Sequence, residues 1–222
     1  KGTKHMKIYG LQKLTLLDFP GKAACTVFTG GCNFCCPFCQ NADLIFLPEG
    51  LKEIELQDFF TFLEKRKGLL DGVCISGGEP LLQKDFEAFC TAVKRLGYLV
   101  KLDTNGSFPE RLDRLINQKM VDYVAMDIKN APEHYAKTVG LLDFDISPVL
   151  ESVQILLRGK VPYEFRTTVV KEYHTAERLV SAAKWLKGAK RYFLQSFVAS
   201  ENVIESGLHA YQKEQLEAFV HQ

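Results

Sequence analysis

The feature of this sequence that most constrains its fold is a regular alternation of short apolar runs with longer segments of helical periodicity. The runs are rich in Val, Ile, Phe and Tyr and are bounded by turn residues, which is typical of strands. Strands are predicted over residues Ala23–Thr29, Gly72–Ser76, Tyr98–Asp103, Val121–Asp127, Tyr163–Val170 and Arg191–Phe197. Helices are predicted near Leu56–Leu63 and Phe86–Leu96, and over Glu110–Lys119, Pro148–Arg158, Thr175–Lys187 and Gln212–His221.

This strict alternation predicts an α/β fold in which helices cover a parallel sheet. The chain has 222 residues, and its six strand–helix units fall short of the eight units of a closed barrel. An open partial barrel and a doubly wound sheet both fit, and they differ in strand order. No repeat, linker or low-complexity tract divides the chain, so one domain is expected over residues 6–222. Residues 1–5 precede Met6 and are interpreted as a remnant of cloning.

Unusual polar and glycine-rich segments lie at or near the ends of the predicted strands. In order they are Gly30–Cys39, Ser76–Pro80, Asp103–Gly106, Asp127–Lys129, Arg166–Thr168 and Gln195–Ser196. In both candidate architectures ligands bind at the carboxyl ends of the strands. We therefore expect these segments to converge on one rim and to form a ligand site there.

The cysteines are unevenly distributed. Four of the seven lie within eight residues, at Cys32, Cys35, Cys36 and Cys39. An odd number crowded at one point is a poor disulfide framework and, where no export signal is visible, favours metal or catalytic chemistry. The other three lie in apolar segments and are expected in the core: Cys25, Cys74 and Cys90.

Cys32, Cys36 and Cys39 have the spacing C-x3-C-x2-C. Thiolates select zinc, copper or iron–sulfur clusters. A structural zinc site needs four ligands, usually in two separated pairs, and no second pair is present. The bacterial ferredoxin motif does not fit either, because Phe38 and Ala42 stand where that motif requires cysteines. Three thiolates can hold three corners of a cubane and leave one iron without a protein ligand. An open metal position is typical of a catalytic site.

The three cysteines follow the first predicted strand, and the aromatic Phe38 precedes the last of them. This pattern resembles the cluster motif of the radical S-adenosylmethionine (SAM) superfamily. The resemblance implies a partial (β/α)6 TIM-like open barrel with parallel strands and helices outside. It also implies a 4Fe–4S cluster whose open iron is chelated by SAM, and a 5′-deoxyadenosyl radical that abstracts a hydrogen atom. No catalytic side chain beyond the cluster and the SAM site is implied.

The same resemblance gives roles to the rim residues. Gly77 and Gly78 would let the backbone approach the ligand closely, and Glu79 would offer its carboxylate to the SAM ammonium group. The planar guanidinium of Arg166 suits the SAM carboxylate and ribose, and Gln195 falls near the adenine. The other SAM contacts implied are Phe38, Asp103, Thr104, Asn105, Asp127 and Lys129. A similarity of these segments to glycyl-radical activases further implies a monovalent cation site at Asp103, Thr104, Met126 and Asp127.

Within the superfamily, the segments 14–22 and 28–33 resemble the glycyl-radical enzyme activating enzymes. The most similar subgroup activates anaerobic ribonucleoside-triphosphate reductase, an anaerobic ribonucleotide reductase. Cys35 and Gln40 depart from its pattern, in which a basic residue and His are common at these places. The implied function is a SAM-dependent oxidoreductase that removes a Cα hydrogen atom from a glycine of a large glycyl-radical enzyme. Reduced flavodoxin or ferredoxin is the implied electron donor.

Three alternatives stay open. A radical SAM enzyme acting on a small molecule, such as one making a deazaguanine precursor, would have a closed polar pocket and no protein partner. A non-enzymatic iron–sulfur electron-transfer module would have a fourth protein ligand, and a zinc-binding interaction protein would hold zinc. The balance of 28 Lys and Arg against 27 Asp and Glu argues against a nucleic-acid partner. No apolar run reaches the ~18 residues of a membrane span, so a cytoplasmic protein is expected.

Overall fold

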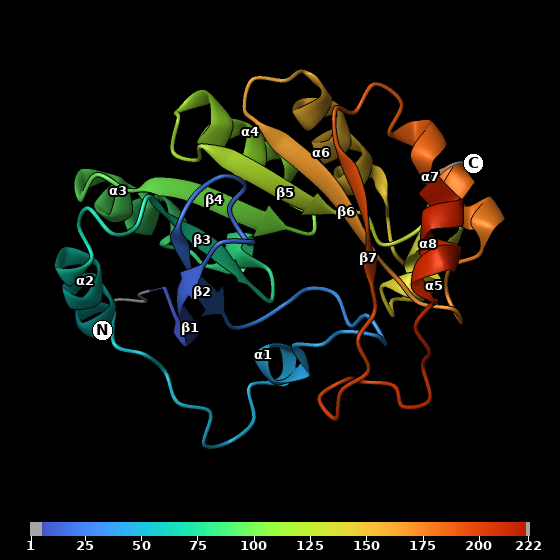
Figure 1. Ribbon diagram of the computed structural model, residues 1–222, viewed down its shortest axis with the longest axis horizontal. Coiled ribbons are helices and arrows are strands. Elements are labelled where there is room, and N and C mark those ends of the chain that lie inside the picture. The colour runs from blue at the N-terminus through green and yellow to red at the C-terminus, as the bar shows by residue number, and fades with distance from the viewer. Residues whose placement is uncertain (1–5, 221–222) are drawn as a thin grey trace.

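The computed structural model describes residues 6–220, which form one seven-stranded sheet (Figure 1). Its strands are β1 (Ile8–Thr15), β2 (Ala24–Thr29), β3 (Gly72–Gly77), β4 (Leu99–Thr104), β5 (Tyr123–Asp127), β6 (Tyr163–Val169) and β7 (Tyr192–Ser196). All six predicted strands are confirmed, as β2 to β7. The interpretation of residues 1–5 and the predicted helix end at His221 lie outside the described residues.

Strand order decides between the two architectures. The order in the sheet is β1-β2-β3-β4-β5-β6-β7, and β2 to β7 are parallel throughout. In a doubly wound sheet the strand order reverses at a switch point. Here the strands lie side by side in the sheet in the same order as in the sequence. β1 and β7 lie at opposite ends of the sheet and do not pair with each other. The fold is therefore an open, partial barrel, as expected.

β1 was not predicted. It pairs antiparallel with β2, and its register shifts twice along the pairing. Most of its residues are exposed or only half-buried, because the strand lies at the edge of the sheet. A strand of this kind carries no continuous apolar run, which is the signal that identified the other six.

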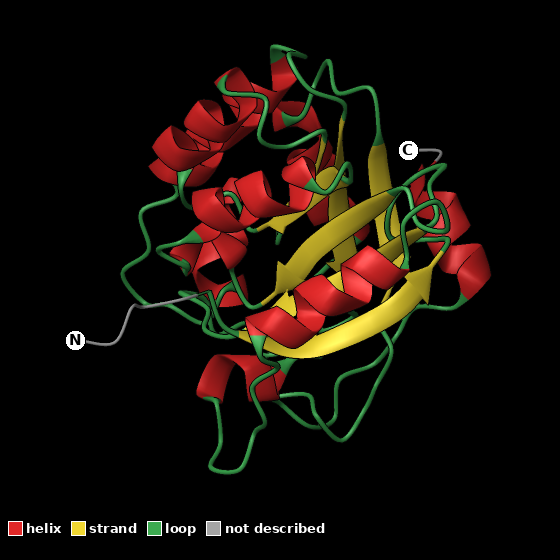
Figure 2. Ribbon diagram, turned by 90° about the vertical axis from the view of Figure 1, so that its left-hand side faces the viewer, coloured by secondary structure: helices red, strands yellow, loops and turns green. Residues whose placement is uncertain are grey.

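Most of the helices lie around the outside of the curved sheet (Figure 2). They are α1 (Ala42–Phe46), α2 (Leu56–Lys65), α3 (Phe86–Arg95), α4 (Pro109–Asn117), α5 (Tyr135–Thr138), α6 (Ser147–Leu157), α7 (Ala176–Trp185) and α8 (Lys213–Val220). The six predicted helices are confirmed, and the short helices α1 and α5 were not predicted. No helix in residues 6–220 is long and apolar enough to cross a bilayer.

The two faces of the sheet differ in polarity. On the outer face, Val73 of β3 pairs with Val100 of β4, and both are fully buried beneath the helices. On the inner face, Asp103 of β4 and the Asp127–Arg166 pair of β5 and β6 bring charged side chains together. Residues paired across parallel strands share a face, so this alternation follows from the strand register. The main apolar core thus lies between the sheet and the outer helices, whereas the inner face carries these charged residues and a small apolar cluster of Phe19, Ala24 and Tyr123.

Candidate functional site

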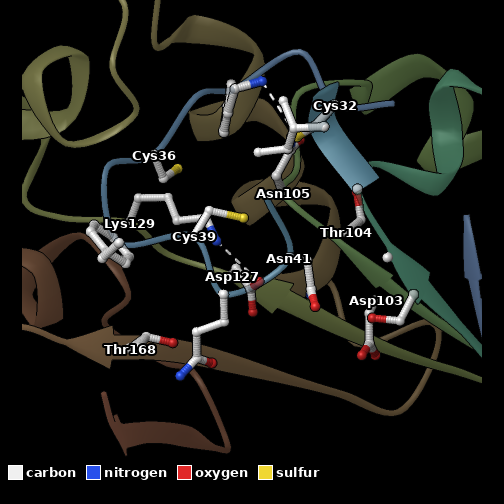
Figure 3. Close-up of a pocket in the computed structure, with 17 residues that line it drawn as sticks. Cys32, Cys36, Cys39, Asn41, Asp103, Thr104, Asn105, Asp127, Lys129 and Thr168 are labelled. Atoms are coloured by element: carbon white, nitrogen blue, oxygen red, sulfur yellow. Dashed lines mark hydrogen bonds and ion pairs between the residues drawn. The ribbon is translucent and has the colours of Figure 1, made fainter. Parts of the chain in front are cut away.

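A pocket opens at the carboxyl ends of the parallel strands (Figure 3). It is formed by the segments after β2, β3, β4 and β5 and by the end of β6, so the predicted convergence on one rim is confirmed for five of the six segments, and Gln195–Ser196 does not line the pocket. The predicted site residues that line it are Cys32, Cys36, Phe38, Cys39, Gly77, Gly78, Asp103, Thr104, Asn105, Asp127 and Lys129. Six further residues line the pocket and were given no individual role: Phe34, Ser76 and Thr168 lie within the predicted rim segments, whereas Gln40, Asn41 and Ile45 lie outside them.

The three motif cysteines are free thiols on one loop, and all three line the pocket. The N–H of Cys39 donates to the carbonyl of Cys36 at 2.9 Å, which closes the turn between them. Burial raises the pKa of the Cys32 thiol to about 11 and that of Cys36 to about 12, while the Lys129 ammonium acts in the opposite direction on both. Cluster ligation would replace these protons, since the thiolate is the metal ligand.

Cys35 does not line the pocket. Its N–H donates to the carbonyl of Val139 at 2.9 Å, and its own carbonyl lies against Gly140. This tie to the segment after α5 separates Cys35 from the three motif cysteines, although it is their neighbour in sequence.

The glycine turn after β3 packs against the cysteine loop. The N–H of Gly78 donates to the carbonyl of Thr29 at 2.9 Å, and the N–H of Glu79 donates to the carbonyl of Gly31 at 2.8 Å. A Cβ atom on Gly78 would lie 2.0 Å from the carbonyl oxygen of Gly31. The glycines therefore let the turn after β3 approach the backbone of the cysteine loop closely. Gly77 and Gly78 also line the pocket.

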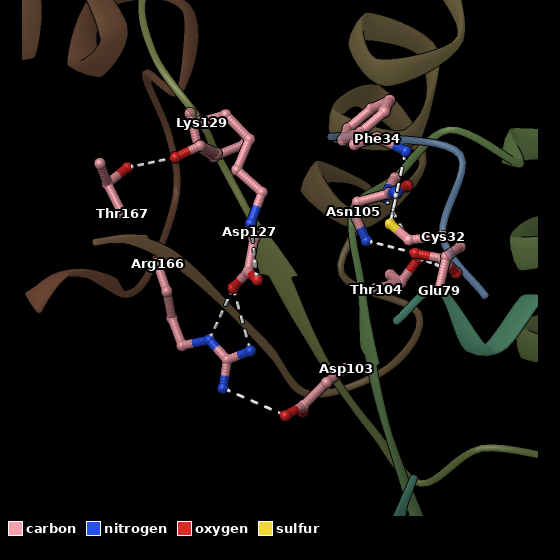
Figure 4. A network of polar contacts seen from close by, with 12 residues as sticks. Cys32, Phe34, Glu79, Asp103, Thr104, Asn105, Asp127, Lys129, Arg166 and Thr167 are labelled. Atoms are coloured by element: carbon pink, nitrogen blue, oxygen red, sulfur yellow. Dashed lines mark hydrogen bonds and ion pairs between the residues drawn. The ribbon is translucent and has the colours of Figure 1, made fainter. Parts of the chain in front are cut away.

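Glu79 is fully buried and does not line the pocket (Figure 4). Its carboxylate accepts hydrogen bonds from the N–H of Leu81 at 3.0 Å, the hydroxyl of Thr104 at 2.9 Å and the N–H of Asn105 at 2.7 Å. Burial raises its pKa to about 7, although these three donors partly offset the effect. In this arrangement Glu79 joins the turn after β3 to the end of β4.

Arg166 also lies outside the pocket lining, and it bridges two carboxylates (Figure 4). Its guanidinium contacts Asp127 at 3.0 Å and Asp103 at 3.3 Å. Asp127 in turn pairs with Lys129 at 3.1 Å. Burial acts to raise the pKa of Asp127, but Lys129 and Arg166 hold it at about 2. Burial likewise opposes the charge of Lys129, but the Asp127 carboxylate keeps its pKa above the usual value.

Phe38 is buried beside the motif cysteines and packs on the rings of Tyr173 and His174, with centroids 5.6 and 5.9 Å away. His174 accepts a hydrogen bond from the N–H of Val170 at Nδ1, so its Nε2–H donates to the carbonyl of Lys129 at 2.8 Å. This histidine fixes the backbone that carries Lys129. Gln195 is exposed on β7 and pairs in register with the pocket-lining Thr168, but it lies outside the pocket itself.

The donor set fits an iron–sulfur cluster that keeps one open metal position. Within the described residues, no three His, Cys, Asp or Glu side chains converge on a single metal ion. A cubane does not require such convergence, because each thiolate binds a different iron. Soft thiols on one wall and hydroxyl, carboxylate and ammonium groups on the facing strand ends suit a cluster beside a polar, zwitterionic ligand.

An open (β/α)6 barrel with a three-cysteine loop at its rim defines a class of protein that binds a cofactor at its strand ends. Residues 26–187 match the family model described as the radical SAM superfamily. The match covers most of the chain, and the chain therefore belongs to the radical SAM superfamily. Membership implies a 4Fe–4S cluster and SAM as the cofactors.

Two curated relatives carry more specific names. The chain is 33% identical over 194 residues to a protein of Methanocaldococcus jannaschii named as a glycyl-radical enzyme activating enzyme, covering 86% of this chain and 79% of the relative. It is 32% identical over 177 residues to the pyruvate formate-lyase-activating enzyme of Listeria monocytogenes, covering 74% of this chain and 68% of the relative. The chain thus has activating enzymes among its relatives.

Solved structures support the fold. SuiB of Streptococcus suis bound to S-adenosylmethionine aligns with a TM-score of 0.65 at 14% identity, covering 86% of this chain and 44% of SuiB. Native anSMEcpe with bound AdoMet aligns with a TM-score of 0.59 at 17% identity, covering 76% of this chain and 49% of that protein. At such low identity these likenesses show the fold alone.

Proposed function

We propose that this protein is a glycyl-radical enzyme activating enzyme. It would be an oxidoreductase that uses SAM and a 4Fe–4S cluster to remove a Cα hydrogen atom from a glycine of a partner enzyme. The observation that carries the proposal is that three free thiols of one loop line one pocket, in a chain with two relatives named as activating enzymes. Cys32, Cys36 and Cys39 would hold the cluster. When bound, the cluster and SAM would supply the radical chemistry.

The protein's own residues would bind and orient SAM. Lys129 and Asp127 present opposite charges at the pocket, which suits the carboxylate and the ammonium group of an amino acid. Phe38 and its aromatic neighbours would exclude water from the side of the cysteine loop. The proposed SAM site also includes Gly77, Gly78, Thr104, Asn105 and Gln195. Glu79 would contribute its carboxylate from behind the glycine turn.

A monovalent cation is part of the proposal, held by Asp103, Thr104, Met126 and Asp127. Asp103 and Asp127 are both paired with Arg166 in the structure. A cation between these two carboxylates would therefore compete with the guanidinium.

The cluster assignment is tested with two neighbouring cysteines. Anaerobically reconstituted and reduced protein is expected to convert SAM to 5′-deoxyadenosine and methionine. Cys36→Ala should abolish this conversion because it removes a ligand, while Cys35→Ala should retain it because Cys35 does not line the pocket. Chromatography of the products measures both. Turnover by Cys36→Ala at the wild-type rate would defeat the ligand assignment.

The partner is tested by mixing. We propose anaerobic ribonucleotide reductase as the partner and reduced flavodoxin or ferredoxin as the electron donor. Because a relative is named for pyruvate formate-lyase, that enzyme is included as a second candidate. Electron paramagnetic resonance should show a glycyl-radical doublet with the reductase. A doublet with pyruvate formate-lyase alone would change the partner, and SAM cleavage with no doublet in either mixture would favour a small-molecule substrate.

A further inference from the structure

Three polar side chains form a closed ring of hydrogen bonds beside Cys32 (Figure 4 shows Asn105 next to the sulfur). The side-chain amide of Asn105 donates to Oδ1 of Asn33 at 2.9 Å. Nδ2 of Asn33 donates to the hydroxyl of Ser107 at 2.9 Å, and this hydroxyl donates to Oδ1 of Asn105 at 2.6 Å. Each member of the ring is therefore both a donor and an acceptor.

The orientation of the Asn105 amide follows from this ring. The backbone N–H of Ser107 also points at Oδ1 of Asn105, at 2.9 Å. A backbone N–H can only donate, so the atom facing it must be the amide oxygen. The amide nitrogen of Asn105 then faces Asn33 and Cys32, and exchanging its oxygen and nitrogen would break the ring.

The second amide hydrogen of Asn105 is directed at Cys32. Nδ2 of Asn105 lies 3.9 Å from Sγ of Cys32, and the backbone N–H of Phe34 donates to the same sulfur at 3.4 Å. Over residues 6–220, Asn105 is the only side chain that donates to a motif cysteine. Its own backbone N–H is held by the buried carboxylate of Glu79 at 2.7 Å. Asn105 is thus fixed both at its backbone and at its amide.

We propose that Asn105 is a positioning residue that raises the reduction potential of the cluster through its N–H···S contact with Cys32. Hydrogen bonds to the sulfur atoms are among the factors that set the potential of an iron–sulfur cluster. Reduction adds a negative charge that spreads onto the ligand sulfurs, so a donor stabilises the reduced form more than the oxidised form. The inference rests on the proposed cluster at Cys32, Cys36 and Cys39.

The test is a redox titration of the reconstituted protein, followed by electron paramagnetic resonance of the reduced cluster. Asn105→Leu keeps a similar volume and removes the donor. We expect its midpoint to be more negative by about 59 mV or more, which is a tenfold change for a one-electron couple. Asn117→Leu is the matched control, because Asn117 is exposed on α4 and donates only to Asp113. Its midpoint should equal that of the wild type.

Ser107→Ala is the second variant, and it leaves Asn105 itself in place. It removes the hydroxyl link of the ring but keeps the backbone N–H of Ser107, so a smaller shift in the same direction is expected. If iron analysis shows that Asn105→Leu holds no cluster, Ser107→Ala decides the question. A wild-type or more positive midpoint in the variants that hold a cluster would overturn the inference. Absence of a cluster signal in the wild type would instead defeat the proposed cofactor.

Discussion

Glu79 is a buried carboxylate whose hydrogen-bond partners are all uncharged. Its donors are two backbone N–H groups and the hydroxyl of Thr104. Burial raises its pKa from the ordinary 4.5 to about 7. The folded protein therefore holds this proton to a higher pH than the unfolded chain does. The contribution of Glu79 to stability is present below pH 4.5 and is progressively lost as the pH rises toward 7.

This shift predicts a pH-dependent stability that belongs to one residue. Between about pH 5 and pH 8, the wild type should lose about 2 kcal/mol of unfolding free energy relative to Glu79→Gln, which cannot titrate. Urea unfolding of the reduced apoprotein at several pH values measures the difference. The control is Glu151→Gln, at an exposed position on α6. Its unfolding free energy should change with pH as that of the wild type does. Parallel curves for the wild type and Glu79→Gln would show that Glu79 does not titrate as the geometry implies.

At this scale, sequence patterns identified which residues gather at the rim but not which way every side chain points. Glu79 turns behind the glycine turn because the end of β4 supplies two donors for its carboxylate and the N–H of Leu81 a third, and no spacing rule encodes that. Arg166 is engaged by two carboxylates from other strands. A signal for Thr168 was available, because it lies two residues after Arg166 in the same strand and so shares its face.

Among the elements, three neighbouring strands are linked at their carboxyl ends by one side chain. Arg166 of β6 contacts Asp127 of β5 and Asp103 of β4. All three groups are largely buried, so their charges interact strongly and depend on one another. The same ion pairs hold Asp127 in its ionised form at the pocket wall, where the proposed SAM site needs it.

Arg166→Met should therefore destabilise the sheet as well as the site. We expect a loss of about 3 kcal/mol in the unfolding free energy, because two buried carboxylates lose a partner while Lys101 and Lys129 still neutralise them in part. Arg158→Met is the matched control, since that side chain is 56% exposed and its pair with Asp113 spans 3.8 Å. It should cost less than about 1 kcal/mol in urea unfolding. Equal losses in both variants would contradict a structural role for the bridge.

The elements that could be predicted are those with a strong period. β2 to β6 are buried on the outer face, all six predicted strands are rich in apolar residues, and the long helices have one apolar face. β1 is an exposed edge strand with two register shifts, so its pattern is irregular. α1 and α5 are 5 and 4 residues long, too short to display a helical period.

The whole molecule is an arch with two free edges. β1 and β7 end the sheet and do not pair with each other, so the barrel has a lateral opening between these two edges of the sheet. Strict alternation of strands and helices could not exclude a doubly wound sheet, because strand order is a property of the assembled sheet. The observed order places the unpaired edge of β7 at this opening, and β7 carries an exposed apolar side chain.

Phe193 is that side chain, and it leads to a prediction about partner binding. It pairs with Arg166 across β6 and β7, so it faces the polar interior of the barrel, yet 48% of it is exposed. An exposed aromatic residue at a lateral opening is suited to contact an entering chain segment. If the partner's glycine segment enters here, Phe193→Ser should lower the yield of glycyl radical severalfold. It should leave SAM cleavage without the partner unchanged, since Phe193 does not line the pocket.

The matched control for this prediction lies at the opposite end of the barrel. Leu69 is 64% exposed just before β3 begins, away from the carboxyl ends of the strands. Leu69→Ser should change neither activity, because it removes a similar exposed apolar surface at a place the partner does not reach. The spin count of the glycyl doublet and the amount of 5′-deoxyadenosine report the two activities separately. An unchanged doublet in Phe193→Ser would mean that the partner enters from the pocket mouth above the strand ends instead of through the lateral opening.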